Sequence, residues 1–531
     1  MHPIISPAWL WLLHPFLVHA QTEPQTYRAS FTVNLVQRYQ TIDGFGFCEA
    51  FQRAHSISNL PQPFQNEVLD LLFNTTTGAG FSIFRVGLGS SEDSRGDHMN
   101  SPQPSPDIEF HWDGYDSGQV WVAKQAQRYG VETFYADAWS APGWMKTNGR
   151  DDQGGRLCGV RGEGSANGTK CGTPPVSYID EYSQYLARYV KEYIDAGIPI
   201  RHVGFLNEPN LVKNYATMQS TGSQAADIIP SLTRALSKLN LATVGISCCE
   251  AQGWSMARDL LTQLSSALPN FSSYLSIVTT HTYKGSPPGP DIPLETQGLP
   301  TWVSEISPIM DRLGLTTTWY LNHAENEGLR NAINIHEALT KGNASAYIYW
   351  IGAGQSKAEA PFIWAPNRPE RVSSGGIVGG RYTIGSTYWA SAHFSRFIRS
   401  GARRVEVRQE MTGGRGGSLV EEGTLLLSAY DNLDGSVVVQ VINNSDVAVG
   451  EIEVELWDQL VRFGSDGKRD VSRGLEMRGQ DCEVETWVTD NERRFVVVAS
   501  GEKLWRDGSF RGPLPARSLT TYVVRCVQWG S

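Results

Sequence analysis

The chain has 531 residues, and its 55 acidic against 45 basic side chains give a formal net charge of −10. Such an acidic balance disfavours a surface that binds nucleic acid or another polyanion. The 16 Trp, 20 Tyr and 19 Phe supply many flat apolar faces, which suit sugar rings and a large core equally. The length accommodates a barrel of roughly 250 to 400 residues together with a second domain.

The first residues of the chain are typical of a secretory signal peptide. The apolar stretches Ala8–Leu13 and Phe16–Val18 lead to the small residue Ala20, although Lys and Arg are missing before them. No later apolar run approaches the roughly 18 residues that a membrane-spanning helix needs. We therefore expect a secreted, extracellular protein that does not span a membrane. Five glycosylation sequons fit this route, at Asn74, Asn167, Asn270, Asn343 and Asn443.

From about Thr41 to Arg396 short β-branched or aromatic runs alternate with amphipathic stretches. The expected strands are Ile42–Phe47, Ser82–Leu88, Val131–Ala138, His202–Leu206, Thr243–Ser247, Leu275–Thr280, Thr301–Ser304 and Ala346–Trp350. The expected helices include Pro63–Phe73, Tyr178–Ala196, Ala225–Leu239, Thr318–Leu339 and Thr387–Arg399. Eight alternations with right-handed crossovers predict a (β/α)8 TIM barrel in the α/β class. A doubly wound sheet is the alternative, disfavoured because no Gly-rich phosphate fingerprint follows the first strand.

After about Ser400 the pattern changes to short alternating runs broken by Gly, Asn and Asp, which predict a β-sandwich. These runs are Thr424–Tyr430, Ser436–Asn443, Ile452–Leu456, Arg494–Ala499 and Ser518–Val524. The strand-like segment Arg28–Gln37 precedes the barrel, and we expect it to add a strand to the sandwich. The expected domains are a signal peptide over 1–20, that N-terminal strand within 21–40, the barrel over 41–396 and the C-terminal sandwich over 397–531.

Seven cysteines in an exported chain leave at least one outside any internal pair. Cys158 and Cys171 bracket a Gly-rich loop, and Cys482 and Cys526 could join strands of the C-terminal domain, so each pair is a candidate disulfide. The state of the other three cysteines stays open: Cys48, Cys248 and Cys249. A zinc site is disfavoured because no C-x-x-C or H-x-x-x-H spacing accompanies them, and we expect neither metal nor cofactor.

Two short segments carry most of the functional information. FLNEPN, over Phe205–Asn210, and WVSEIS, over Trp302–Ser307, each end an apolar strand-like run on a glutamate. Carboxylates at the C-terminal ends of different barrel strands can flank one glycosidic bond. We expect Glu208 to be the acid/base and Glu305 the nucleophile of a retaining glycoside hydrolase. A single carboxylate at the end of a strand would not indicate a glycosidase. Two glutamates that each end an apolar strand-like run do.

Neighbouring polar residues fit the same site. Asn207 could hydrogen-bond a sugar hydroxyl, and Tyr283 in the segment THTYKG could donate to Glu305. His281 lies two residues before Tyr283, at the C-terminal end of the same expected strand, although a core tyrosine or histidine would explain both residues equally well.

Indole side chains gather at the same rim of the expected barrel. The run DAWSAPGWMKTNG ends the third strand with Trp139, Ser140 and Trp144, and Trp350 ends the eighth. We expect these indoles to stack on sugar rings, although a single Trp more often belongs to a core. Arg85 interrupts the apolar second strand, which predicts a buried carboxylate partner.

Six segments in fixed order resemble glycoside hydrolase family 30, and specifically its fungal xylanases: IDGFGFCEAFQRA, FRVGLGSS, DAWSAPGWMK, FLNEPN, THTYKG and WVSEIS. The resemblance implies a retaining hydrolase with Glu208 as acid/base and Glu305 as nucleophile. It also implies that Arg53, after the first strand, reads a glucuronic acid branch on xylan. Without the resemblance, Arg53 would be a surface arginine paired with an acid such as Glu49. The long loop Gly89–Tyr115, with Asn100, could close one end of the groove and release xylobiose.

Other substrates and one other class of function remain open. The resemblance extends to enzymes that cut β-1,6-galactan, β-1,6-glucan and glucosylceramide. The segment Gly44-Phe45-Gly46 lacks the Trp-rich motif of the galactanases and so favours xylan as the substrate. A non-catalytic carbohydrate-binding protein is disfavoured because both glutamates are present. A metal-dependent barrel hydrolase would need a His-x-His pair after the first strand, which is missing. We expect a monomer with a polysaccharide or oligosaccharide substrate, and no nucleic acid or membrane partner.

Overall fold

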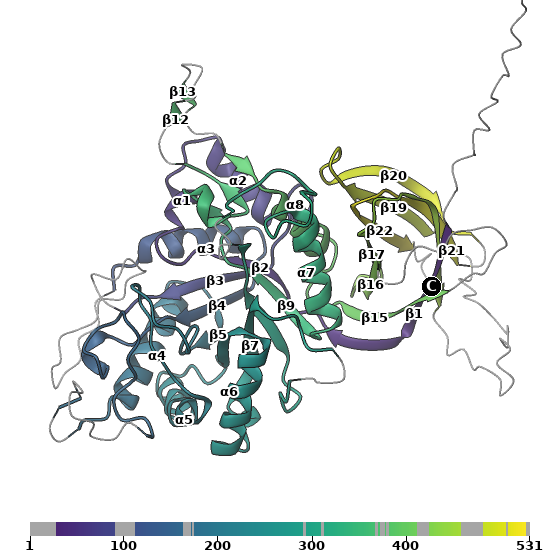
Figure 1. Ribbon diagram of the computed structural model, residues 1–531. Coiled ribbons are helices and arrows are strands. Elements are labelled where there is room, and N and C mark those ends of the chain that lie inside the picture. The colour runs from purple at the N-terminus through teal and green to yellow at the C-terminus, as the bar shows by residue number, and fades with distance from the viewer. Residues whose placement is uncertain are drawn as a thin grey trace, which may run out of the picture.

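A computed structural model describes residues 28–90, 112–162, 171–172, 175–289, 294–308, 313–366, 370–371, 377–378, 382–410, 424–457, 482–505 and 508–526. It consists of a closed barrel surrounded by helices and a β-domain beside it (Figure 1). The proposed signal peptide, Asn167, Asn100 and most of the loop Gly89–Tyr115 lie outside the described residues.

The barrel has eight parallel strands, and each pairs with the next along the chain until the last closes on the first. The strands are β2 (Gly44–Cys48), β3 (Ile83–Leu88), β4 (Thr133–Ala138), β5 (Ile200–Gly204), β6 (Gly245–Gly253), β7 (Leu275–Lys284), β8 (Thr301–Glu305) and β9 (Ala344–Tyr349). The (β/α)8 prediction is confirmed. Four of these strands, β2, β3, β8 and β9, are buried along their whole length, which is why they read as continuous apolar runs in the sequence.

The helices that connect the strands cover the outside of the barrel (Figure 1). They are α1 (His55–Ser58), α2 (Phe64–Phe73), α3 (Gln119–Arg128), α4 (Ile179–Asp195), α5 (Gly222–Lys238), α6 (Trp254–Ala267), α7 (Gly328–Thr340) and α8 (Ser386–Ser395). Helix α5 begins with a capping box, in which the Thr221 side chain and the Gln224 side chain each bond the other's backbone N–H.

One helix prediction is wrong over its first half. Helix α7 begins at Gly328, whereas the pattern predicts a helix from Thr318. The Trp319 indole donates to the carbonyl of Arg517 in the C-terminal domain, and Asn322 and His323 have positive φ values. The turns that this requires cannot continue a right-handed helix, so the amphipathic pattern there reflects burial between two domains.

The C-terminal domain is built on one nine-stranded sheet in the order β20-β19-β22-β17-β16-β15-β1-β18-β21. Its strands are β1 (Arg28–Thr41), β15 (Arg403–Glu410), β16 (Leu425–Asp431), β17 (Val437–Asn443), β18 (Val449–Trp457), β19 (Cys482–Thr489), β20 (Val496–Lys503), β21 (Ser509–Leu514) and β22 (Ser518–Cys526). Side chains from both ends of the sheet meet in one apolar core, including Phe31, Val439, Val454 and Phe510. The N-terminal β1 pairs with β15 and β18, so the side β-domain contains both ends of the chain as predicted.

Short strands also form two small sheets, and the sequence pattern did not predict them. They are β10 (Ala353–Gly354), β11 (Ile363–Trp364) and β14 (Thr383–Ile384) in one, and β12 (Glu370–Arg371) and β13 (Ile377–Val378) in the other.

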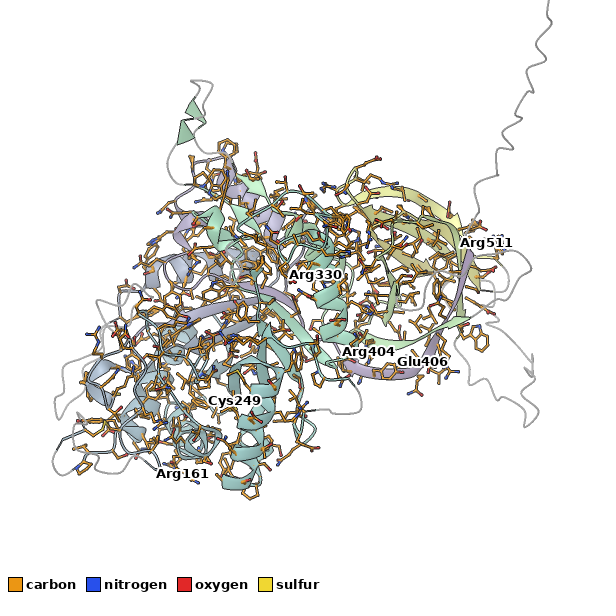
Figure 2. All side chains as sticks on the ribbon, viewed as in Figure 1. Arg161, Cys249, Arg330, Arg404, Glu406 and Arg511 are labelled. Carbon is orange, nitrogen blue, oxygen red and sulfur yellow. A yellow bond between two sulfur atoms is a disulfide. The ribbon has the colours of Figure 1, made fainter. Side chains whose placement is uncertain are left out.

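Three disulfides stand among the described residues. Cys158–Cys171 and Cys482–Cys526 confirm the two expected pairs, and the neighbours Cys248 and Cys249 form the third. Buried Cys48 belongs to none of the three. Cys249 lies within the barrel, whereas Arg404, Glu406 and Arg511 mark the side domain (Figure 2).

The described helices include none that is long and apolar enough to cross a membrane. Among the sequons, Asn270 and Asn343 are exposed and Asn74 is half-buried. Asn443 is fully buried, and its amide donates to the carbonyls of Val447 and Pro515. A glycan on Asn443 is therefore incompatible with the fold.

Candidate active site

The two glutamates singled out by the sequence meet at the C-terminal end of the barrel. Glu305 is the last residue of β8, and Glu208 follows β5 by four residues. One carboxylate oxygen of each lies within 4.8 Å of the other, and both side chains are almost fully buried. This spacing is close to the roughly 5 Å carboxylate separation of retaining glycosidases and too short for an inverting pair.

An unusual backbone conformation holds Glu208 in place. Its φ is +43°, in the left-handed region that side chains other than glycine rarely adopt. The Glu208 N–H donates to the carbonyl of Glu250 at 2.9 Å, and Pro209 follows directly. Strain of this kind persists only where the surroundings enforce it, which is common at functional sites.

Glu305 accepts hydrogen bonds from two neighbours. Arg85 donates to Oε2 at 2.5 Å, and Tyr283 donates to Oε1 at 2.9 Å, as the sequence predicts for Tyr283. Burial and the neighbouring Glu208 raise the pKa of Glu305, while His281 and Arg85 oppose the rise. The two donors favour the ionised carboxylate, which is the form that a nucleophile needs.

Arg85 is completely buried inside the barrel, and its partners explain why a charge interrupts β3. Besides Glu305, it donates to Asp137 at 2.6 Å, to the side-chain oxygen of Asn207 at 2.8 Å and to Glu250 at 3.2 Å. Burial and the charge of Glu250 raise the pKa of Asp137 to about 8, although Arg85 acts to lower it by favouring the charged form. Asp137 is thus a weaker acid than an exposed aspartate.

His281 lies between the catalytic carboxylates and a third glutamate. Its Nδ1 is 3.3 Å from Glu208 and 3.8 Å from Glu305, and its Nε2 is 2.8 Å from Glu250. Burial lowers the pKa of His281, but the three carboxylates outweigh burial and raise it to about 10.

A pocket of about 260 Å³ opens above the two glutamates. Its walls are Phe51, Arg53, Trp139, Glu208, Leu211, Lys213, Tyr215, Gln252, Tyr283, Glu305 and Trp350. Phe51, Trp139 and Trp350 contact one another at ring-centroid distances between 5.0 and 6.1 Å. Aromatic walls beside two carboxylates suit a sugar ring, whose C–H faces pack on apolar surfaces while its hydroxyls need polar partners.

The residues predicted to bind substrate fall into three groups. Arg53, Trp139, Tyr283 and Trp350 line the pocket, while Arg85, Asn207 and His281 lie beneath it and contact the catalytic carboxylates or each other. Contrary to expectation, Ser140 and Trp144 are not part of the walls that the described residues form.

The positions of those two residues have clear physical reasons. The Ser140 hydroxyl donates to the Ala141 carbonyl and accepts from buried Lys146, so it braces the loop after β4. The Trp144 indole packs edge-on against Tyr178 at 5.1 Å, beside helix α4. Both residues therefore shape the loop that presents Trp139.

Sequence reasoning missed several residues that hold the site, above all Glu250, Asp137 and Tyr135. The expected fifth strand stopped at Ser247, whereas β6 continues through Glu250 to Gly253. An acid three residues beyond the end of the expected strand, in the segment SCCEAQG, was the available signal. Asp137, inside the buried run of β4, was another.

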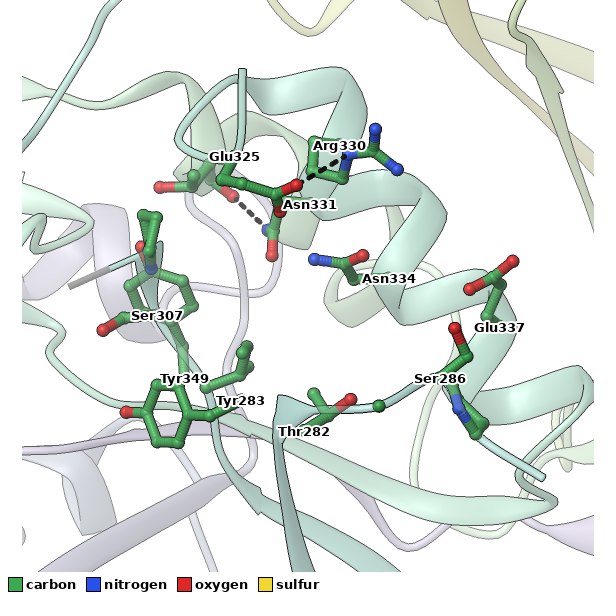
Figure 3. Close-up of a pocket in the computed structure, with 15 residues that line it drawn as sticks. Thr282, Tyr283, Ser286, Ser307, Glu325, Arg330, Asn331, Asn334, Glu337 and Tyr349 are labelled. Carbon is green, nitrogen blue, oxygen red and sulfur yellow. Dashed lines mark hydrogen bonds and ion pairs between the residues drawn. The ribbon is translucent and has the colours of Figure 1, made fainter. Parts of the chain in front are cut away.

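A second pocket of about 340 Å³ adjoins the first, and Tyr283 lines both. Figure 3 shows it between the ends of β7 and β8 and helix α7, with Asn334 and Glu337 on the helix side. Glu325 and Arg330 face each other there at 3.9 Å. Tyr283 thus separates the catalytic pocket from a neighbouring polar hollow.

Glu208, His281 and Glu305 lie close enough together to be considered as metal ligands. Their bonding argues against that role. Both nitrogens of His281 face carboxylates, so the ring offers protons rather than lone pairs, and Arg85 already donates to Glu305. The donor set therefore fits an acid and a nucleophile better than a cation.

A TIM barrel with paired carboxylates at the C-terminal ends of its strands, below an aromatic-walled pocket, defines a glycoside hydrolase. A model of glycosyl hydrolase family 59 matches residues 42–396. The catalytic domain of GH30 xylanase C from Talaromyces cellulolyticus is 34% identical, covers 93% of this chain and 100% of its own, and superposes with a TM-score of 0.73. By these two findings the chain belongs to the glycoside hydrolases of the family 30 and family 59 type.

More distant relatives carry other names. An endo-1,6-beta-D-glucanase from Neurospora crassa is 24% identical over 86% of this chain and 96% of its own. A putative glucosylceramidase 2 from Caenorhabditis elegans is 23% identical over 83% of this chain and 82% of its own. The family resemblance of the sequence motifs is confirmed, whereas the substrate is not fixed by these relatives.

Proposed function

We propose that the protein is a retaining glycoside hydrolase that cleaves β-1,4-xylan by double displacement, with Glu208 as acid/base and Glu305 as nucleophile. The observation that carries the proposal is the distance of at most 4.8 Å between oxygens of the two carboxylates. That distance leaves room for an anomeric carbon but none for the additional water that an inverting mechanism places between the acids.

The reaction divides between the two glutamates. Glu208 protonates the glycosidic oxygen while a Glu305 oxygen attacks the anomeric carbon, so that the glycosidic bond breaks and a glycosyl ester forms. Glu208, now ionised, takes a proton from water, whose oxygen displaces Glu305 and restores both groups. Arg85 and Tyr283 orient the nucleophile, and Trp139 and Trp350 offer faces for the sugar ring.

Xylan is supported by the similarity to a xylanase. The Talaromyces xylanase C shares 34% identity with this chain, against 24% for the Neurospora glucanase. The alternative substrate is β-1,6-glucan, because the glucanase matches 96% of its own length. A β-1,6-galactanase or a glucosylceramidase-like hydrolase remains a further alternative, since the same barrel accommodates all of these activities.

Within xylan, a glucuronic acid branch fits the pocket because two basic side chains, Arg53 and Lys213, line its wall. The Arg53 guanidinium also lies over the Trp350 ring at 5.1 Å. Cleavage is endo-acting, releases xylobiose from the non-reducing end, or combines both. We further propose a secreted, glycosylated monomer.

Products from five substrates test the proposal: glucuronoxylan, arabinoxylan, β-1,6-glucan, β-1,6-galactan and glucosylceramide, separated by chromatography. We expect xylo-oligosaccharides from glucuronoxylan at a rate at least ten times that on any substrate outside the xylans. Faster release of gentio-oligosaccharides from β-1,6-glucan would refute xylan in favour of the alternative. NMR of the first product anomer, taken before mutarotation, reports retention or inversion.

A further inference from the structure

Glu250 has more hydrogen-bond donors around it than either proposed catalytic glutamate. Its Oε2 accepts from His281 at 2.8 Å, Ser304 at 2.9 Å and Arg85 at 3.2 Å, and its Oε1 accepts from Tyr135 at 2.6 Å. The side chain is 1% exposed and does not line the pocket. A buried carboxylate with this many donors is ionised, and its contacts show that it acts through other residues.

The backbone at Glu250 is as specialised as its side chain. Between the β6–β7 pairs Cys248–Val278 and Ala251–Thr280, β6 contains one residue more than β7, which is a β-bulge. Glu250 itself has a φ of +51°, and its carbonyl accepts the N–H of Glu208. Bulges next to active sites redirect side chains, and this one connects Glu250 to Glu208 through both backbone and side chain.

The two contacts of His281 determine its charge. An ionised carboxylate can only accept hydrogen bonds, and a neutral imidazole has only one N–H to donate. Nε2 therefore carries a proton toward ionised Glu250, and Nδ1 faces both Glu208 and the ionised Glu305, where a proton is favoured over a lone pair that would point at the Glu305 charge. We propose that Glu250 is a positioning residue that keeps His281 doubly protonated, so that a fixed positive charge lies between Glu208 and Glu305.

This proposal rests on the proposed roles of Glu208 and Glu305. A positive charge 3.3 Å from Glu208 stabilises the carboxylate that remains after Glu208 has given its proton to the leaving group. The same charge, 3.8 Å from Glu305, keeps the nucleophile ionised before the attack. The charge on His281 thereby favours the ionised forms of both Glu208 and Glu305, and the negative charge of Glu250 balances the charge on His281.

The charged and titratable groups around His281 and Glu250 agree with this arrangement. They are Arg85 on β3, Tyr135 and Asp137 on β4, Glu208 after β5, Glu250 on β6, Tyr283 on β7 and Glu305 on β8. Burial raises the pKa of Glu250, but Arg85 and His281 outweigh burial and bring it to about 2. Glu250 is thus the member of the acidic cluster that stays charged at every working pH.

The Glu250→Gln variant separates the proposal from its rivals by the direction of a pH shift. If the proposal holds, the variant loses two charges: the positive charge of His281, within 4 Å of Glu208 and Glu305, and the negative charge of Glu250, on the far side of the imidazole ring. The loss of the nearer, positive charge has the larger effect on the two carboxyls. Both limbs of the kcat/KM profile then move to higher pH, by about one unit, because both carboxyls become weaker acids. If Glu250 acts only as a nearby negative charge, both limbs move to lower pH. A fall in rate with unmoved limbs would mean that Glu250 is only structural; either of the last two results overturns the proposal.

Tyr135→Phe is the matched control. It removes a hydrogen bond from Glu250 but leaves the carboxylate charge, so its rate can fall while its pH limbs stay in place. If both substitutions acted only by disturbing the structure, Glu250→Gln and Tyr135→Phe would change the rate and the pH limbs in the same way.

Nitrogen NMR of the histidines tests the proposal without any substrate, and so independently of the proposed function. In the protein at pH 7, His281 should show the imidazolium pattern, identified as the signal that His281→Gln removes. In Glu250→Gln the same signal should become that of a neutral ring. A neutral His281 in the unmodified protein overturns the proposal even if Glu250→Gln fails to fold. If His281 is an imidazolium but substituting Glu208 or Glu305 leaves turnover intact, the proposed catalytic roles fail instead.

Discussion

Glu208 and Glu305 are held by different groups although both contact the same histidine. Glu305 accepts from Arg85 and Tyr283, two donors that favour its charged form. The only side-chain bond described for Glu208 is the one to His281, and the rest of its carboxylate faces the pocket. The proposed nucleophile is therefore the carboxylate with more donors, and the proposed acid/base, with fewer donors, can exchange a proton with substrate and water.

The first prediction concerns these two residues. Glu208→Gln and Glu305→Gln should each lower kcat by several orders of magnitude without unfolding the protein, because the amide keeps the volume but cannot donate the proton or attack. A 2-fluoro glycoside of the matching sugar should label Glu305 alone, as read by peptide mass mapping. A label on another residue, or inversion of the anomeric centre, would contradict the assignment.

The second prediction concerns Arg53, whose structural partner differs from the one that the sequence suggested. Its guanidinium pairs with Glu359 at 2.6 Å and with the carbonyl of Ala50, whereas Glu49 accepts the N–H of Ala353. If Arg53 binds a glucuronic acid branch, that branch must share the guanidinium with Glu359. Arg53→Ala should then lower kcat/KM on glucuronoxylan by about tenfold, the lower end for a charged hydrogen bond, and spare linear xylo-oligosaccharides.

Glu359→Gln is the companion variant for Arg53. By removing the competing carboxylate, it should increase the preference for glucuronoxylan over linear xylo-oligosaccharides. Equal losses on both substrates for Arg53→Ala would show that Arg53 supports the pocket wall through Glu359 and Trp350 instead.

At the scale of elements, the sequence predicted the strands best where they are buried on both faces. All eight barrel strands were located because their apolar runs are interrupted only by turns, and Arg85 and Glu305 stood out as charges against that background. Glu250 did not, because the bulge in β6 extends the strand past the point where the apolar run ends. A bulge depends on pairing with β7, which the local sequence does not encode.

The side domain was predicted less completely for the same reason. Strands β15, β19 and β21 were not anticipated, and each finds its place through pairing with distant strands. The first half of the expected helix before Gly328 failed because its apolar residues contact the side domain. In each case a non-local contact overrides the local pattern.

The third prediction belongs to a pair of strands. Cys482 and Cys526 are direct partners in the β19–β22 register, and the disulfide between them closes a loop of 44 residues. Loop-closure entropy gives such a crosslink a stabilising contribution of up to about 4 kcal/mol. Replacing both cysteines with serine should lower the free energy of unfolding by about 2 to 4 kcal/mol in urea titration. Removal of Cys158–Cys171, whose sequence separation is only 13 residues, should cost less; the opposite order would contradict this account.

At the scale of the whole molecule, the side domain is joined to the barrel through helix α8. Trp389 and His393 project from the helix, and Phe397 follows its end; all three pack against Trp487 or Phe495 of the β-domain. His393 is fully buried and bonds threonines on two strands of the sheet, Thr521 at 2.6 Å and Thr489 at 2.8 Å. The two parts therefore share a core, and we expect them to unfold together.

The bonding and the burial of His393 both fit a neutral ring. The Thr521 hydroxyl gives its one proton to Gln440 at 2.6 Å, so it must accept the Nδ1–H of His393. Nε2 is then left to accept the hydroxyl of Thr489. Burial, with a smaller contribution from Arg396, accordingly lowers the pKa of His393 to about 3.

The fourth prediction follows from this neutral histidine at the domain junction. A pKa of about 3 in the folded protein, against about 6.5 in the unfolded chain, means that protonation favours unfolding. The stabilising contribution is complete above about pH 6.5 and declines as the pH falls toward 3. Between pH 7 and pH 5 it should decrease by about 2 kcal/mol. His393→Gln offers the same two threonines an amide that does not titrate, so the stability gap between wild type and variant should narrow by that amount at pH 5. Denaturant titrations of both proteins at the two pH values measure the gap; a gap that does not change with pH would show that His393 is already charged in the folded protein or does not govern the junction.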